Sequence, residues 1–509
     1  MRQRISSSII FMTVGLALAA SVAQANHITV TNVSLRQTST NAGTTCVQFN
    51  LSWENSWRAT WVEPSTPEGS VTITNWDAAW VFVKYRLSGG NWQHVMLASN
   101  GHTAPLGVTI DLGTNGGGIN VGAFIYRSAN GSGTLNLSPV RLRWDYVAAG
   151  LTTTNLIDIS VQAIEMVYIP KGPFSVGDGS GLGDMKGSFT DGAWTSGTAF
   201  PFRITSEAAL LITNAPGYLW GTTSNPTLNY TINPQGILSN AFPKGYNAFY
   251  CMKYEITQGQ YTDYLNLLTT AQTNNNFSAT LATYRRQTIG LNPLGRFTNA
   301  APDRAANGFS GSWLLNYADW AGLRPMTELE FEKVCRGPKY PFPEEVASGA
   351  HCYGADQIPI TNFFGTDGSG TETAMPTNAN CTIQSPTVGG PVRVGIFATS
   401  NSTRVASGAG YYGVMDLSGN VQEFAASVAY RTNQLGARFF TGLHGDGALT
   451  ASGNQNVPDW PSATGLGYRG GTWDSWGGVQ RVSDRSLAAY YQSASPEELN
   501  GGRAVRTAP

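Results

Sequence analysis

The chain has 509 residues, a length that suggests about two to four domains with substantial cores. Only 12% of the residues are charged and the formal net charge is -1, which excludes the basic surface that nucleic-acid binding requires. The 59 glycines, with frequent Ser, Thr and Asn, predict a β-rich protein with an uncharged polar exterior.

Residues 1–25 have the pattern of an export signal. Two arginines precede an apolar run, and Ala-Gln-Ala at positions 23–25 is a small-x-small cleavage pattern. A membrane anchor is the alternative, but Thr13 and Gly15 interrupt the run, and no later stretch is long and apolar enough to span a bilayer. We therefore expect a secreted or cell-surface protein whose mature chain begins near Asn26 and has no transmembrane span.

Residues 26–162 consist of short runs of alternating apolar and polar residues, such as CVQFNLSW and WVFVKYRL, separated by Gly, Asn and Ser turns. Period-two alternation at this spacing predicts an antiparallel β-sandwich of the immunoglobulin or fibronectin type. Trp53, Trp57, Trp61 and Trp80 could form an aromatic surface for a sugar, although aromatic residues in small sandwiches more often belong to the core.

The pattern changes near residue 163, and three helices follow. Thr257 with Gln260, and Thr327 with Glu330, form capping boxes that predict helix starts. A further helix is predicted within WLLNYADWAG, ended by Gly322. Beyond residue 340 the chain is rich in turns. Residues 163–509 therefore read as an α+β unit that we expect to fold independently of the sandwich.

The five cysteines are widely spaced and do not form a zinc pattern. Cys352 and Cys381 bracket a loop rich in Gly, Thr and Asn, and are a candidate disulfide in an exported protein. Buried free thiols are the alternative. The five histidines show no i, i+4 spacing, so we expect no three-histidine iron or zinc centre.

The order of several segments is more informative than any one of them. Six segments follow one another along the chain: MVYIPKGPFSVGD, FYCMKYEITQGQYTDYLN, YADWAGLRPMTELEFEKVCRGP, YYGVMDLSGNVQEF, YRGGTWDS and GGRAVR. In these segments and their order, the chain from about residue 165 to residue 509 resembles the formylglycine-generating enzyme family, also called the sulfatase-modifying factor family. The resemblance implies a C-type-lectin-like α+β fold with limited regular structure, preceded here by the sandwich.

The resemblance also implies a structural calcium site at SGNVQEF. The ligands would be the side chains of Asn420 and Glu423 and a backbone carbonyl of Gly419 or Val421, and such hard oxygens suit Ca²⁺. A plain turn with a solvated Glu423 is the alternative. Gln422 stands where the family usually has tryptophan.

Enzymes of this family use two cysteines and copper, placed shortly after an R-G-G-[ST]-[WY] pattern. In this chain Ser475 and Gln480 occupy the matching positions, and neither can replace a thiolate that binds Cu(I). We therefore expect no copper and assign no catalytic residue. The polar and aromatic residues around this segment suggest a ligand cleft, with core strands and structural ion pairs as the alternative. The proposed lining is Trp473, Ser475, Trp476, Arg481 and Arg485.

These expectations favour a non-catalytic secreted protein, that is, a pseudoenzyme, which binds an unknown extracellular ligand, a glycan or a protein. Extracellular assembly, including a homo-oligomer, is a second use of the same scaffold. Two alternatives stay open: an enzyme of the same superfamily with different chemistry, and a structural surface or filament subunit.

Overall fold

The computed structural model describes residues 2–4, 28–178, 187–192, 200–222, 230–231, 235–352, 354–385, 387–399, 402–431, 437–475, 477–489 and 496–509. Apart from residues 2–4, the predicted export signal lies outside these ranges. Strands account for 37% and helices for 11% of the structure, in several sheets. A β-rich α+β protein is thus confirmed at this coarse level, while the C-type-lectin-like fold stays a prediction.

Strands far outnumber helices along the chain. In chain order the strands are β1 (Arg2–Arg4), β2 (Thr29–Ser39), β3 (Thr44–Thr66), β4 (Gly69–Leu87), β5 (Gln93–His94), β6 (Val108–Thr114), β7 (Asn120–Arg127), β8 (Gly131–Asp145), β9 (Leu156–Ile169), β10 (Phe174–Val176), β11 (Phe189–Asp191), β12 (Phe202–Ile204), β13 (Leu210–Ile212), β14 (Leu219–Gly221), β15 (Tyr230–Thr231), β16 (Gly236–Leu238), β17 (Phe249–Met252), β18 (Gly290–Leu291), β19 (Phe297–Thr298), β20 (Arg324–Pro325), β21 (Asn362–Phe364), β22 (Thr373–Met375), β23 (Gln422–Ala426), β24 (Tyr430–Arg431), β25 (Leu466–Arg469), β26 (Asn500–Gly501) and β27 (Ala504–Thr507). The helices are α1 (Gln258–Asn266), α2 (Thr270–Thr273), α3 (Gly311–Trp320), α4 (Glu328–Arg336) and α5 (Arg404–Ser407), with 3₁₀ turns η2 (Ala279–Thr283), η3 (Ala463–Gly465) and η4 (Gly477–Gln480).

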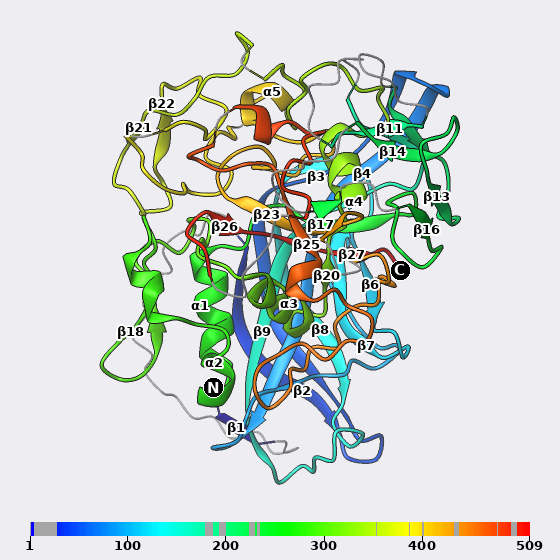
Figure 1. Ribbon diagram of the computed structural model, residues 1–509. Coiled ribbons are helices and arrows are strands. Elements are labelled where there is room, and N and C mark those ends of the chain that lie inside the picture. The colour runs from blue at the N-terminus through cyan, green and yellow to red at the C-terminus, as the bar shows by residue number, and fades with distance from the viewer. Residues whose placement is uncertain are drawn as a thin grey trace.

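One 12-stranded sheet runs through both predicted units. Its main path is β2-β3-β4-β9-β17-β27-β20, with β8 paired to β3, β7 to β4 and β6 to β7. The long strands of the amino-terminal region extend through the lower half of the molecule in Figure 1. The last strand in chain order, β27, lies inside the sheet between β17 and β20.

Strand β4 is buried on both faces because its alternate side chains enter two different cores. Val81 and Val83 point into the core of the sandwich strands. Trp80 and Phe82 point the other way, into a core built mainly by the second unit. The sequence WVFV is therefore covered on both sides, which is why apolar residues occupy both faces of the strand.

Strand β9 crosses the predicted boundary between the two units. Residues 157–167 of this strand pair with β4, and residues 166–169 pair with β17. The position 162/163 thus lies in the middle of a strand. Since the two regions share a sheet and a core, we expect them not to fold separately.

The three helices predicted from local signals are present. Thr257 and Thr327 each accept a hydrogen bond from the backbone N–H three residues later, and the Gln260 and Glu330 side chains complete both capping boxes. Helix α3 ends before Gly322, whose φ is 69°. It packs on β4, where the Phe82 and Trp320 rings meet edge to face at 5.2 Å.

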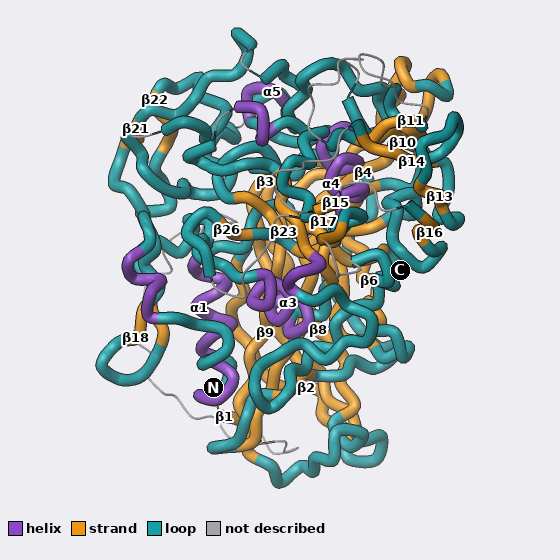
Figure 2. Tube along the Cα trace, in the orientation of Figure 1, coloured by secondary structure: helices purple, strands orange, loops and turns teal. Residues whose placement is uncertain are grey.

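The remainder of the second unit is mostly loop, with short strand pairs. Figure 2 shows loops surrounding β21, β22 and α5 in the upper part of the molecule. Within the described ranges, no helix has the length and apolar character needed to cross a membrane.

Candidate functional site

The predicted calcium loop is a tight turn that leads into β23. Gly419 has a φ of 94°, and a Cβ at this position would lie 2.3 Å from the carbonyl oxygen of Thr382, so glycine is required. Asn420 follows with a φ of 62°, a left-handed conformation that Asn tolerates better than most residues. This turn directs Asn420 and Glu423 inward, and each is 1% exposed. Glu423 is therefore buried and not solvated.

The groups predicted to bind calcium already have protein partners. The Asn420 Oδ1 atom accepts a hydrogen bond from the Val392 N–H at 2.9 Å, and its Nδ2 donates to Glu255. Each carboxylate oxygen of Glu423 accepts a bond of 2.7 Å from Arg503. The Val421 N–H joins the same network by donating to Glu255 at 3.0 Å.

Calcium requires about six to eight oxygen ligands, but here the carboxylate of Glu423 faces a guanidinium cation. Among the described residues, no three His, Cys, Asp or Glu side chains are grouped so that they could hold a metal ion. As placed, these residues do not fit Ca²⁺. Elemental analysis of the purified protein would show whether it contains calcium.

The described residues of the predicted ligand cleft each have contacts with other parts of the protein. Trp473 is 1% exposed and packs in a small apolar core with Val394 and Val421. Ser475 Oγ accepts a hydrogen bond of 2.8 Å from the Thr472 N–H in a local turn. Trp476 lies outside the described residues.

The two arginines of the predicted cleft form ion pairs in separate places. Arg485 is fully buried and donates two hydrogen bonds of 2.8 and 2.9 Å to Glu328 on α4. Arg481 pairs at 2.8 Å with Glu344, whose side chain is 46% exposed. Both arginines thus have carboxylate partners, as in the structural alternative.

The position matched to the second copper cysteine lies beside a thiol that is distant in sequence. Gln480 is fully buried, and its Nε2 donates to Cys352 Sγ at 3.6 Å. Burial raises the pKa of Cys352 and of Cys381. Neither cysteine is part of a disulfide bond in the structure. Their disulfide stays a prediction.

Among the described residues, no histidine or carboxylate side chain forms a hydrogen bond with the Ser475 hydroxyl, which bonds to Thr472. His444 lies elsewhere, where its Nε2 accepts a hydrogen bond of 3.0 Å from the Thr507 N–H on β27. The described contacts therefore do not assemble a serine nucleophile with a histidine.

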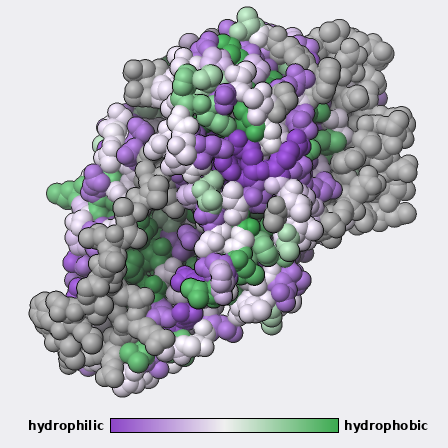
Figure 3. Space-filling model, turned by 90° about the vertical axis from the view of Figure 1, so that its left-hand side faces the viewer, coloured by the Kyte–Doolittle hydropathy of each residue, from purple (hydrophilic) through white to green (hydrophobic). Residues whose placement is uncertain are grey.

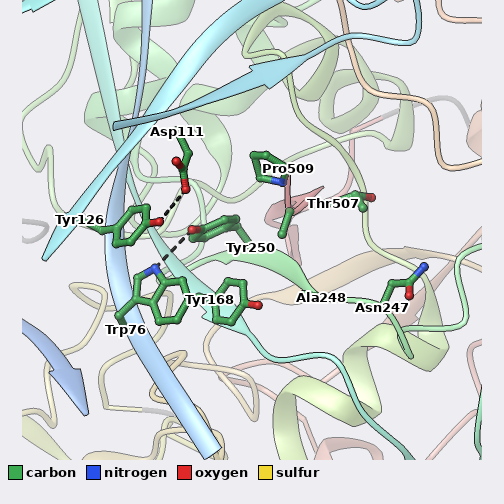
Figure 4. Close-up of a pocket in the computed structure, with 10 residues that line it drawn as sticks. Trp76, Asp111, Tyr126, Tyr168, Asn247, Ala248, Tyr250, Thr507 and Pro509 are labelled. Carbon is green, nitrogen blue, oxygen red and sulfur yellow. Dashed lines mark hydrogen bonds between the residues drawn. The ribbon is translucent and has the colours of Figure 1, made fainter. Parts of the chain in front are cut away.

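A cavity of about 380 Å³ lies where the sandwich strands meet β17 and β27 (Figure 4). Sequence reasoning did not find it, because its walls come from strands that are far apart in the chain. The lining residues are Trp76, Asp111, Tyr126, Tyr168, Asn247, Ala248, Tyr250, Thr507, Ala508 and Pro509.

Four aromatic rings build one wall of this cavity. Tyr168 stacks on Trp76 with 3.8 Å between ring centroids, and Tyr126 lies 5.2 Å from Trp76. The Trp76 Nε1–H donates to the Tyr250 hydroxyl at 3.2 Å. Trp76, Tyr126 and Tyr250 are buried, whereas Tyr168 is half-buried, so Tyr168 is the ring most accessible to a ligand.

The lining of the cavity also contains polar side chains, among them Asp111 and Asn247. Asp111 accepts a hydrogen bond of 2.5 Å from the Tyr126 hydroxyl through Oδ2, and this bond adds to burial in raising the pKa of Tyr126. Asp111 and Tyr168 are half-buried and Asn247 is exposed, so water can reach their side chains. Figure 4 shows Asn247 on the side of the cavity opposite the aromatic wall.

A positive charge lies behind the aromatic wall. The Arg58 guanidinium is 4.3 Å from the centroid of Trp76 and 5.8 Å from that of Tyr126. Arg58 is thus a cation–π partner of Trp76. The cavity thus combines aromatic, amide, hydroxyl and carboxylate groups, which is typical of a small-molecule site.

No family model matches the chain, and no curated protein matches it. The resemblance to the formylglycine-generating enzyme family therefore rests on the six sequence segments quoted above.

Proposed function

We propose that this chain is a non-catalytic, secreted or cell-surface binding protein built on a scaffold of the formylglycine-generating enzyme type. Its ligand site is the cavity between the amino-terminal strands and the second unit. The observation that carries the proposal is a cavity of about 380 Å³ whose lining brings aromatic rings together with the polar side chains of Asp111 and Asn247. Polar groups of this kind, converging on aromatic rings, fix the orientation of a ligand.

The contacts of the matched catalytic segment support the non-catalytic part of the proposal. Ser475 is bonded within its own turn, and Gln480 is buried against Cys352. Neither side chain offers the soft anionic sulfur that Cu(I) prefers. Incubation with a sulfatase-type cysteine peptide and copper should therefore leave the thiol unchanged. Enzyme-dependent formation of an aldehyde, seen by mass spectrometry, would favour the enzymatic alternative.

Surface character favours ligand binding over assembly. The most exposed large apolar side chains, Leu106, Leu294 and Ile237, lie on separate segments. On the face drawn in Figure 3, hydrophilic side chains gather across the middle, and hydrophobic ones lie in smaller groups around them. Among the described residues the exposed apolar side chains thus come from separate segments, whereas an assembly subunit would be expected to present a broader apolar area.

A cavity-filling variant tests the ligand site. Ala248→Trp places an indole in the cavity, whereas Ala148→Trp makes the same change at an exposed alanine and serves as the control. A library of neutral, cationic and anionic extracellular metabolites is screened by thermal shift. A true ligand at 100 times its Kd should add about 2.7 kcal/mol to the unfolding free energy of the wild type and of Ala148→Trp.

The expected result is that Ala248→Trp loses this stabilisation. If every ligand that stabilises the wild type stabilises Ala248→Trp equally, the cavity is not the binding site.

A further inference from the structure

Three charged side chains meet at the main sheet, outside the lining of the cavity. Lys253 follows β17, Glu165 lies on β9 and Asp77 lies on β4, and these strands are neighbours in the order β4-β9-β17. The Lys253 Nζ atom lies 2.9 Å from Glu165 Oε2 and 4.0 Å from Asp77 Oδ2. We propose that Lys253 and Asp77 form an intramolecular amide bond, with Glu165 as the group that carries the proton.

The register of the sheet holds the three side chains on one face. Asp77 lies opposite Val167, and Glu165 is two residues before Val167 on the same strand, so Asp77 and Glu165 point to the same side. The Lys253 N–H donates a hydrogen bond of 3.0 Å to the carbonyl oxygen of Glu165, which continues the pairing of β17 with β9. Since the strands fix the reacting groups in place, attack within the chain needs little further ordering.

The three side chains are shielded from water. Asp77, Glu165 and Lys253 are 0%, 2% and 4% exposed. A buried ammonium group depends on its carboxylate partners for stabilisation, and transfer of a proton from Lys253 to Glu165 removes two buried charges at once. Exclusion of water also protects an amide bond, once formed, from hydrolysis.

Lys253 differs from other buried lysines in its partners. The amino groups of Lys84, Lys244 and Lys333 donate to backbone carbonyl oxygens, for example from Lys84 to Trp320 at 2.7 Å. Lys253 instead faces two buried carboxylates, one that can accept its proton and one that can receive its nitrogen. A structural ion pair needs only one carboxylate, and the second one adds a buried negative charge that amide formation removes.

Hydrogen bonds prepare the carboxyl group of Asp77 for attack. Its Oδ1 accepts bonds of 2.9 Å from the Ser56 hydroxyl and from the Trp57 N–H, and its Oδ2 accepts one of 3.0 Å from Trp53 Nε1. The two donors at Oδ1 stabilise the negative charge that develops there when a nucleophile adds to the carbon. Asp77 is thus the acceptor of the nitrogen, and Oδ2, at 4.0 Å from the amine, is the oxygen that leaves.

Burial favours the protonated form of both carboxyl groups. It raises the pKa of Asp77, and it raises the pKa of Glu165 to about 7. Burial lowers the pKa of Lys253, but the charges of Glu165, Tyr254 and Asp77 together raise it above its ordinary value. The ammonium form therefore predominates, and its proton passes to Glu165 across the 2.9 Å contact before the nitrogen attacks.

Bonds and protons balance without a further reactant. The neutral amine of Lys253 adds to the carbon of the protonated Asp77 carboxyl group, and the C–N bond forms. Glu165 gives the proton that it received to the Asp77 hydroxyl, which leaves as water when the C–O bond breaks, and takes up a second proton from the nitrogen. The products are an amide, one water molecule and a protonated Glu165.

The amide bond joins the two sequence regions covalently. It links β4 of the amino-terminal region to the second unit and closes a loop from residue 77 to residue 253. Like a disulfide, such a bond restricts the unfolded chain, but reductants do not break it.

Intact-mass spectrometry of residues 26–509 under reducing and denaturing conditions tests the bond. We expect the mass of the unmodified sequence minus one water molecule, and, after proteolysis, a peptide with Asp77 joined to a peptide with Lys253. Glu165→Gln, which keeps both partners and removes the proton carrier, should have the full mass. Glu344→Gln, the same change at an exposed side chain, is the control and should lose one water molecule like the wild type.

The wild-type measurement decides the matter even where a variant fails to fold. A full mass for the wild type, with the Asp77 and Lys253 peptides recovered separately, overturns the proposal and leaves an ion pair. A Lys253 peptide joined to Glu165 overturns the assignment of Asp77 as the acceptor. Loss of one water molecule in folded Glu165→Gln overturns the assignment of Glu165 as the proton carrier.

Discussion

His94 is a histidine that the fold keeps neutral. It is buried, its Nε2 lies 2.5 Å from the carbonyl oxygen of Val121, and no described group bonds to its Nδ1. Burial, followed by the charges of Lys84 and Arg506, lowers the pKa of His94 well below its ordinary value of 6.5. The unfolded chain therefore binds a proton near pH 6.5 that the folded chain does not.

We predict that His94 makes folding less favourable as the pH falls through 6.5. Relative to His94→Gln, the wild type should lose about 1.4 kcal/mol of unfolding free energy between pH 7.5 and pH 5.5, measured by urea denaturation. Comparing the two proteins cancels the titration of other buried groups. His351→Gln, at an exposed histidine, is the control. A difference that stays constant across this range would mean that His94 binds protons equally in both states.

Cys352 and Cys381, the candidate pair from the sequence, should be oxidised to a disulfide in exported material, because that compartment is oxidising. Alkylation of the denatured protein without reductant should then label only Cys46, Cys251 and Cys335. With reductant, all five should be labelled. Full labelling of Cys352 and Cys381 without reductant would contradict the predicted disulfide.

Helix α4 carries the densest set of buried charges described in the fold, and all nine of its residues are buried. Glu328 binds Arg485 and Arg469, and Glu330 binds Arg324 at 2.6 Å. A buried carboxylate that loses its charge leaves its arginine partner uncompensated, which costs far more than breaking an exposed pair.

Substitution of one buried and one exposed glutamate tests whether burial determines the cost of losing the carboxylate charge. Glu328→Gln should lower the unfolding free energy by about 3–5 kcal/mol, because one buried carboxylate faces the guanidinium groups of both Arg485 and Arg469. Glu344→Gln, at the exposed partner of Arg481, should cost about 0–1 kcal/mol. Urea denaturation measures both, and equal losses would show that burial does not determine the effect.

Local sequence was sufficient for the helices and insufficient for the site. The capping boxes at Thr257 and Thr327 act over three residues, so their signal survives in the sequence alone. The Trp76–Tyr250 contact joins residues 174 apart. The Arg485–Glu328 pair joins residues 157 apart. Such pairings depend on strand order, which no local pattern encodes. The sequence therefore does not reveal the cavity, and it predicts a cleft position for Arg485, which in the structure pairs with Glu328.

At the scale of the whole molecule, the shared core predicts that the two sequence regions depend on each other. Trp80 donates a hydrogen bond of 2.8 Å to the carbonyl oxygen of Ala321, and Lys84 donates one of 2.7 Å to that of Trp320. Residues 163–509 alone would lose these contacts and expose the apolar face that β4 covers.

We therefore expect residues 163–509, expressed alone, to be insoluble or to lack a cooperative melting transition. Residues 26–509 should be soluble and melt cooperatively under the same conditions. Solubility after centrifugation and thermal melting followed by circular dichroism are the measurements. A soluble fragment with a sharp transition would restore the expectation of two independent units.

The position of β27 also constrains the order of events during folding. Residues 504–507 form the last strand of the main sheet in chain order, yet they lie inside it, and Arg503 reaches the Met252 carbonyl across 251 residues. Closing so long a loop is slow, and it cannot begin until these residues have been synthesised. Strands β17 and β20 therefore lack the strand between them until the last residues of the chain have been synthesised, and the central sheet is incomplete until then.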